Sequence, residues 1–199
     1  MYEFLVFGQA VTLLEVVAVL TGLVSVWLTL RLDVLTWPLG IVSVGCYAFV
    51  FASAKLYADA ALQIAFVVTG LYGWQQWRRA RSVTSDLLPV EASESGEWIA
   101  SITTSAIGIL AIGGLLAHLT DSPAPFADAS VFVLSLMATL LQALRRINGW
   151  WFWIVVDVIS LPLYWSRALY LTAMLYLVFL GLSIAGLKAW RSRVAAAQS

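Results

Sequence analysis

The chain has 199 residues, of which 62% are hydrophobic and 11% charged, and its mean hydropathy is +0.92. A soluble domain is close to half apolar and a quarter charged, so this composition excludes a soluble domain, a disordered chain and a nucleic-acid-binding protein. The formal net charge is zero, and the single cysteine and single histidine exclude a disulfide framework and a Cys/His metal cluster. What remains is a small polytopic membrane protein.

Seven segments are long and apolar enough to be candidate membrane spans. A spanning helix needs about 20 mostly apolar residues, because a helix satisfies its own backbone groups inside lipid. The candidate spans lie near residues 9–30, 36–53, 58–77, 98–120, 128–144, 150–166 and 168–190. One connection, residues 78–97, is too polar to cross a membrane and is predicted as a cytoplasmic loop.

The distribution of lysine and arginine predicts the orientation of these spans. The side that holds the N-terminus carries only Lys55 and Arg167, whereas the opposite side is rich in arginine. Those residues are Arg31, Arg78, Arg79, Arg81, Arg145, Arg146, Lys188, Arg191 and Arg193. Positively charged loops stay in the cytoplasm. We therefore expect the N-terminus outside and the C-terminus inside.

The sequence matches itself without a gap when it is shifted by 113 residues. The matched pairs include Trp37 with Trp150, Tyr57 with Tyr170, Gly73 with Gly186 and Trp77 with Trp190. This predicts a first three-helix repeat over residues 1–77, a linker helix over 98–120, and a second repeat over 121–199 with a short cytoplasmic tail. Because three spans reverse direction, the linker helix makes the two repeats parallel. Parallel repeats are a recurrent transporter architecture, although a duplicated scaffold without transport is the alternative.

A carboxylate and two indoles on the sixth span are the clearest candidates for a binding site. A charged residue within a span is costly and is therefore a functional candidate. Trp150, Trp153 and Asp157 are spaced i, i+3 and i+7, which predicts one helix face. The alternatives are that Trp150 is an interfacial anchor and that Asp157 pairs with another group of the bundle. Indole faces stack on flat rings and attract cations, so a flat heterocycle, best with a positive charge, fits this face.

Further polar and aromatic candidates lie on other spans. Gln63 places a buried amide, which needs hydrogen-bond partners, among apolar residues of the third span. Tyr47 and Tyr164 supply hydroxyls and rings, and Trp37 is the counterpart of Trp150 in the first repeat. The chain has no GxxxxGKS, GxxxxGKT, HExxH or GxSxG pattern. We therefore expect no enzyme activity, no cofactor and no metal.

At these positions the sequence resembles the PnuC family of vitamin and nucleoside transporters. The resemblance rests on the motifs WPLGI at residues 37–41, KLY at 55–57, YGW at 72–74 and LYLTA at 169–173. It also rests on the WxxWxxxD pattern that begins at Trp150. It runs from the second span to Trp190, which is nearly the whole chain apart from the polar loop.

The resemblance implies an all-α membrane fold of seven helices arranged 3+1+3, similar to the SWEET sugar transporters. It implies a homotrimer in lipid, with one pathway per subunit. It also implies facilitated diffusion by alternating access across the bacterial inner membrane, after which a cytoplasmic kinase traps the substrate. The family's substrate-binding residues correspond to Trp150, Trp153, Asp157 and Gln63 of this sequence.

Two departures from the family pattern concern the identity of the substrate. Asn148 and Gly149 stand where many members have Glu-Asn, and Thr139 stands where a glutamine is frequent. We expect nicotinamide riboside as the substrate, with thiamine, riboflavin or a nucleoside as alternatives on the same scaffold. A non-transporting membrane receptor or assembly subunit would fit the same composition, as would an ion-coupled symporter with Asp157 as the proton site.

Overall fold

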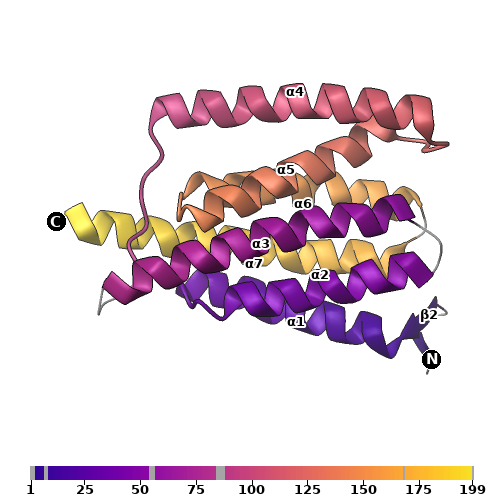
Figure 1. Cartoon of the computed structure of the whole chain (residues 1–199), viewed down its shortest axis with the longest axis horizontal. Helices are drawn as coiled ribbons and strands as arrows, with labels where there is room; N and C mark the ends of the chain where they lie inside the picture. The colour runs from indigo at the N-terminus through magenta and orange to yellow at the C-terminus, as the bar shows by residue number, and fades with distance from the viewer. Residues whose placement is uncertain (1–2, 7–8, 54–56, 84–87, 168, 199) are drawn as a thin grey trace. The chain divides into compact units, whose positions relative to one another are not determined.

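The computed structural model describes residues 3–6, 9–53, 57–83, 88–167 and 169–198. This part of the chain forms seven helices and one short antiparallel hairpin (Figure 1). The helices are α1 (Leu13–Arg31), α2 (Thr36–Ser53), α3 (Tyr57–Val83), α4 (Ser95–Leu119), α5 (Pro125–Ala143), α6 (Asn148–Ser166) and α7 (Tyr170–Gln198). The hairpin pairs β1 (Glu3–Val6) with β2 (Gln9–Thr12). The expectation of an all-helical membrane protein is thus confirmed, apart from this hairpin.

The chain divides into two compact units, Met1–Leu88 and Pro89–Ser199. In the first unit, α1 packs on α2 and α2 packs on α3. In the second unit, α4, α5, α6 and α7 pack in sequence, each helix on the next. Each unit therefore consists of successive helices with few residues between them, and each helix packs on the next, as short connections favour.

Five of the described helices are long and apolar enough to cross a membrane, namely α1, α2, α4, α5 and α7. Large aliphatic side chains on the helices are exposed, such as Val68 (62%) and Leu110 (68%), as expected where lipid is the solvent. The helices α3 and α6, of 27 and 19 residues, are not among these five. They include Gln63 and Asp157, respectively.

The helix bounds differ from the predicted spans where polar residues flank apolar ones. The helix α3 continues beyond residue 77 to Val83, and α4 begins at Ser95, before residue 98. The predicted loop at 78–97 is therefore partly helical, because arginine and alanine are good helix formers whatever their polarity. For the same reason α7 continues through the predicted cytoplasmic tail to Gln198. The first helix begins later than predicted, because Thr12 and Glu15 form a capping box at its start.

The turns that follow α1 and α5 have the same geometry at the 113-residue spacing. Leu32 and Arg145 have positive φ angles, of 59° and 57°. The backbone N–H of each donates to the carbonyl three residues earlier, at 3.1 and 2.9 Å. The N–H of the residue that follows donates to the carbonyl five residues earlier, at 3.1 and 2.8 Å. A left-handed residue with these bonds ends a helix and reverses the chain.

Tryptophan pairs also recur at this spacing, inside each unit. Trp37 packs edge-on against Trp77 with ring centroids 5.4 Å apart and an interplanar angle of 84°. Trp150 packs edge-on against Trp190 at 5.5 Å and 88°. Three of these rings are completely buried and Trp37 is nearly so. The same tryptophan contact therefore joins α2 to α3 in the first unit and α6 to α7 in the second.

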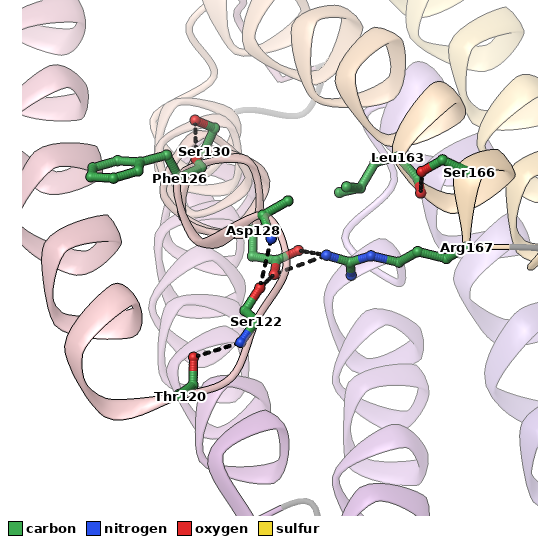
Figure 2. A network of polar contacts seen from close by, with 9 residues as sticks. Thr120, Ser122, Phe126, Asp128, Ser130, Leu163, Ser166 and Arg167 are labelled. Atoms are coloured by element: carbon green, nitrogen blue, oxygen red, sulfur yellow. Dashed lines mark hydrogen bonds and ion pairs between the residues drawn. The ribbon is translucent and has the colours of Figure 1, made fainter.

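An ion pair joins the first turn of α5 to the residue that follows α6 (Figure 2). Arg167, which follows α6, donates to both carboxylate oxygens of Asp128 at 3.0 and 3.1 Å. Asp128 lies in the first turn of α5, and it also accepts a hydrogen bond from Ser122 at 2.5 Å. At the other end of α5, Arg146 pairs with Glu91 at 2.6 Å and with Glu97 of α4 at 2.8 Å.

The bidentate pair between Arg167 and Asp128 predicts a modest stabilisation of the second unit. Both side chains are less than one-third exposed, so Arg167→Gln is expected to lower the free energy of unfolding by about 1 kcal/mol. Thermal unfolding in detergent measures this loss. Arg79→Gln, which removes an exposed arginine from α3, is the control and should leave the midpoint unchanged. An equal shift for both variants would contradict a specific role of the pair.

Candidate functional site

Asp157 is a buried carboxylate at the middle of α6. Its side chain is 1% exposed, and the Ser183 hydroxyl of α7 donates to Oδ2 at 2.9 Å. At about 1.5 Å per residue, Asp157 lies roughly 13 Å along the helix from each end of α6. A hydrocarbon core is about 30 Å thick. The length of α6 is close to this thickness, and Asp157 lies at its middle, the position where a spanning helix holds a carboxylate at the greatest cost.

The helices α6 and α7 meet in three layers of paired side chains. Trp150 pairs with Trp190, Asp157 with Ser183, and Tyr164 with Tyr176. The Tyr164 and Tyr176 rings are stacked, with centroids 5.2 Å apart and planes 20° from parallel. On each helix the three members are seven residues apart, so successive layers are separated by about 10 Å. We call these contacts the α6–α7 ladder.

The polar part of this ladder includes one more hydroxyl. Ser160 lies one turn after Asp157 on α6 and is completely buried. Its hydroxyl has no hydrogen-bond partner among the described residues. Polar groups therefore continue along the α6–α7 interface from the middle of α6 to its last turns. This arrangement provides buried hydrogen-bonding groups between two helices, as a site for a polar substrate requires.

The two candidate indoles of α6 lie in different surroundings. Trp150 is completely buried, with its edge against Trp190 and its six-membered ring against the backbone at Gly186. Trp153 is half-buried and packs against a buried apolar cluster on α5 and α6. That cluster consists of Ala138, Leu141 and Phe152. Trp150 and Asp157 thus face α7 while Trp153 contacts the α5 side, and their predicted roles in substrate binding stay predictions.

Two further candidates lie near the turn between α5 and α6. Asn148 is completely buried, and within the described part of the chain neither its amide oxygen nor its amide nitrogen has a hydrogen-bond partner. Thr139 donates its hydroxyl to the Ser135 carbonyl one turn earlier, at 2.8 Å. Buried polar groups are normally paired. Asn148 therefore has a buried amide whose hydrogen-bonding groups a ligand could use.

The remaining candidates belong to the first unit. Trp37 is buried against Trp77, and Tyr47 is half-buried and stacked on Phe51 at 6.0 Å. Gln63 is half-buried on α3. The structure describes these positions within the first unit, so their part in a common site stays a prediction.

Sequence reasoning missed Ser183 and Ser160, and it gave Tyr176 no specific role. A signal for Ser183 and Tyr176 was present, because Tyr176, Ser183 and Trp190 are spaced seven residues apart on α7. The same spacing relates Trp150 and Asp157 to Tyr164 on α6. Which members of the two series meet depends on the register between the helices. Serine is also common in spans as a helix-packing residue, so its identity alone carries little information.

Comparisons with known proteins agree with this architecture. The sequence model of the family described as "Nicotinamide mononucleotide transporter" matches residues 12–192. The riboflavin/roseoflavin transporter RibM of Streptomyces davaonensis is 29% identical over 194 residues, which cover 96% of this chain and 91% of RibM. The nicotinamide riboside transporter PnuC of Escherichia coli is 23% identical over 207 residues, which cover 92% of this chain and 87% of that protein.

A solved structure shares the fold. The crystal structure of the vitamin B3 transporter PnuC superposes with a TM-score of 0.75 and 26% identity, covering 92% of this chain and 82% of that chain. The family match spans most of the sequence, and five of the described helices are long and apolar enough to cross a membrane. The chain belongs to the nicotinamide mononucleotide transporter family, the PnuC family of multi-pass inner-membrane vitamin transporters.

Proposed function

We propose that this chain carries nicotinamide riboside across the inner membrane by facilitated diffusion. The observation that supports this substrate most directly is the buried carboxylate of Asp157 at the middle of α6. Among the described residues, the hydroxyl of Ser183 donates a hydrogen bond to it. One hydroxyl offsets only part of the cost of a buried carboxylate. A substrate with a positively charged ring, such as nicotinamide riboside, would offset the rest.

In this proposal the site residues take the roles that their chemistry favours. Trp153 stacks on the ring, while Asp157 and Gln63 bind polar groups of the substrate. Trp150 is completely buried against Trp190, so its predicted stacking on the ring requires this contact to open. Asn148 adds a buried amide that has no hydrogen-bond partner among the described residues. The remaining candidates, placed to influence specificity, are Thr139, Trp37, Tyr47 and Tyr164.

We further propose a 3+1+3 arrangement of parallel repeats, similar to the SWEET transporters, with the N-terminus outside. The recurrence of the helix-ending turn and of the tryptophan pair at the 113-residue spacing supports it. Alternating access would come from rocking one repeat against the other. The functional assembly would be a homotrimer in lipid, and a cytoplasmic kinase would retain the substrate by phosphorylation.

Riboflavin is the second candidate substrate. It is favoured by the similarity to RibM, whose identity to this chain is 29%, against 23% for the Escherichia coli nicotinamide riboside transporter. Riboflavin is a larger, neutral flat ring, so stacking on Trp153 would contribute more of its binding and the Asp157 charge less. The two candidates therefore differ in how strongly they depend on the carboxylate.

Thermal stabilisation of the purified protein tests the substrate directly. A ligand that binds only the folded state raises the melting temperature. At a ligand concentration a hundred times the Kd, the free energy of unfolding increases by about 2.7 kcal/mol. We expect a shift with nicotinamide riboside, and counterflow in liposomes should then show flux of the same compound. A shift with riboflavin or thiamine alone would reassign the substrate. Binding without counterflow would contradict transport and favour a membrane receptor.

A further inference from the structure

The middle layer of the α6–α7 ladder differs in kind from the layers that flank it. The Trp150–Trp190 and Tyr164–Tyr176 layers are large aromatic pairs, whereas the middle layer joins Asp157 to Ser183. Both residues of the middle layer are buried, at 1% and 3% exposure. The aromatic pairs on either side hold the two helices at a set spacing. The carboxylate and the hydroxyl therefore meet in a position that neither side chain can easily leave.

We propose that Ser183 is a positioning residue for substrate binding, acting through Asp157. This inference rests on the proposed function, because it assigns Asp157 to the substrate. The Ser183 hydroxyl donates to Oδ2 and fixes the plane of the carboxylate, which leaves Oδ1 for a polar or cationic group of the substrate. A preoriented carboxylate binds more tightly because less rotational freedom is lost on binding.

The corresponding positions of the first unit do not carry a carboxylate and a hydroxyl. At the 113-residue spacing, Asp157 corresponds to Val44 and Ser183 corresponds to Gly70. A side chain larger than hydrogen does not fit at Gly70 without a shift of its neighbour, since a Cβ there would lie 2.9 Å from the side chain of Ile41. The polar layer is therefore specific to the second unit. The first unit packs α2 on α3 without a polar pair at these positions. Packing of α6 on α7 therefore does not by itself require the contact between Asp157 and Ser183.

A double-mutant cycle tests the proposal in the intact protein. Ser183→Ala is expected to weaken binding of nicotinamide riboside about tenfold, which is typical for loss of one hydrogen bond to a charged group. Ser183→Thr keeps the hydroxyl and should recover most of the affinity. In an Asp157→Ala background, Ser183→Ala should have little further effect, because the carboxylate that Ser183 orients is gone and no acceptor replaces it. Titration calorimetry and counterflow would measure the Kd and the KM.

Ser135→Ala is the matched control for this cycle. Ser135 is also buried in the second unit, but its hydroxyl donates to the carbonyl of Val131 in its own helix, at 2.6 Å, rather than to a carboxylate. It should leave the affinity unchanged, which separates loss of a carboxylate partner from loss of a buried hydroxyl. A ligand-free melting temperature for each variant shows whether the fold is intact.

The outcomes separate two kinds of failure. Wild-type affinity for Ser183→Ala, or additive effects of Ser183→Ala and Asp157→Ala, would contradict the positioning role alone. If the wild-type protein bound neither nicotinamide riboside nor riboflavin, the proposed function would fail, and the role of Ser183 with it. A loss of affinity that Ser183→Thr restores and that disappears in the Asp157→Ala background supports the proposal.

Discussion

Gly186→Ala is expected to destabilise the protein by about 1–3 kcal/mol, the usual cost of overpacking a filled interior. A Cβ at Gly186 would lie 2.5 to 2.6 Å from three ring carbons of Trp150. That ring is completely buried and is held against Trp190, so it cannot swing away without breaking the first layer of the ladder. Thermal unfolding in detergent should show a clear drop in the melting temperature.

Gly181→Ala provides the matched control on the same helix. A Cβ at Gly181 would have no heavy atom within 4 Å, and alanine has the better helix propensity. We expect this variant to be neutral or slightly stabilising. Gly73→Ala should repeat the large effect in the first unit, because its Cβ would overlap the Trp37 ring. A neutral Gly186→Ala variant would show that the tryptophan layer is not tightly packed.

Trp153→Ala is expected to weaken substrate binding 5- to 150-fold, which corresponds to about 1–3 kcal/mol of stacking. Trp153 is half-buried, so part of the indole remains available to a ligand while the rest packs on the cluster that contains Phe152. The effect should be larger for riboflavin than for nicotinamide riboside if the flat ring of riboflavin depends more on stacking. The Kd of both compounds measures it.

Trp151→Ala separates stacking from the general loss of an indole. Trp151 is 39% exposed, and the Arg191 guanidinium lies over its ring at 5.3 Å. Two residues along a helix correspond to a rotation of about 200°, so Trp151 points away from Trp153. We expect this variant to keep wild-type affinity. Equal losses for the two variants would indicate that the changes act through the stability of α6 rather than through contact with the substrate.

The two units share a helix-ending turn and a tryptophan pair, but they differ in polarity along their helix interfaces. At the 113-residue spacing, the positions that correspond to Asp157, Ser183, Tyr164 and Tyr176 are Val44, Gly70, Phe51 and Gln63. Only the tryptophan layer is common to both units. The recurring turn and the indole pair support the proposed duplication, whereas the chemistry along the rest of the interface is particular to each unit.

Much of this protein follows from the sequence by itself. Apolar runs near the length of a bilayer predicted the helices, because lipid allows few other structures to span it. The 113-residue spacing was visible because tryptophan and glycine seldom match by chance, and it recurs in the geometry of Leu32 and Arg145. Asp157 was found because an ionisable residue in an apolar span is costly. These are local or compositional signals, so no knowledge of packing was needed.

The tertiary structure decided how these residues meet. The i, i+3, i+7 spacing predicted one face of α6, yet Trp150 packs on Trp190 while Trp153 packs toward α5. The spacing of residues along a helix places their side chains within about a third of its circumference. Which neighbouring helix each side chain contacts depends on how the helices cross. The partnership of Asp157 with Ser183 depends on the register between two antiparallel helices, which the turn between them sets. Residues 26 positions apart become neighbours only once that register exists.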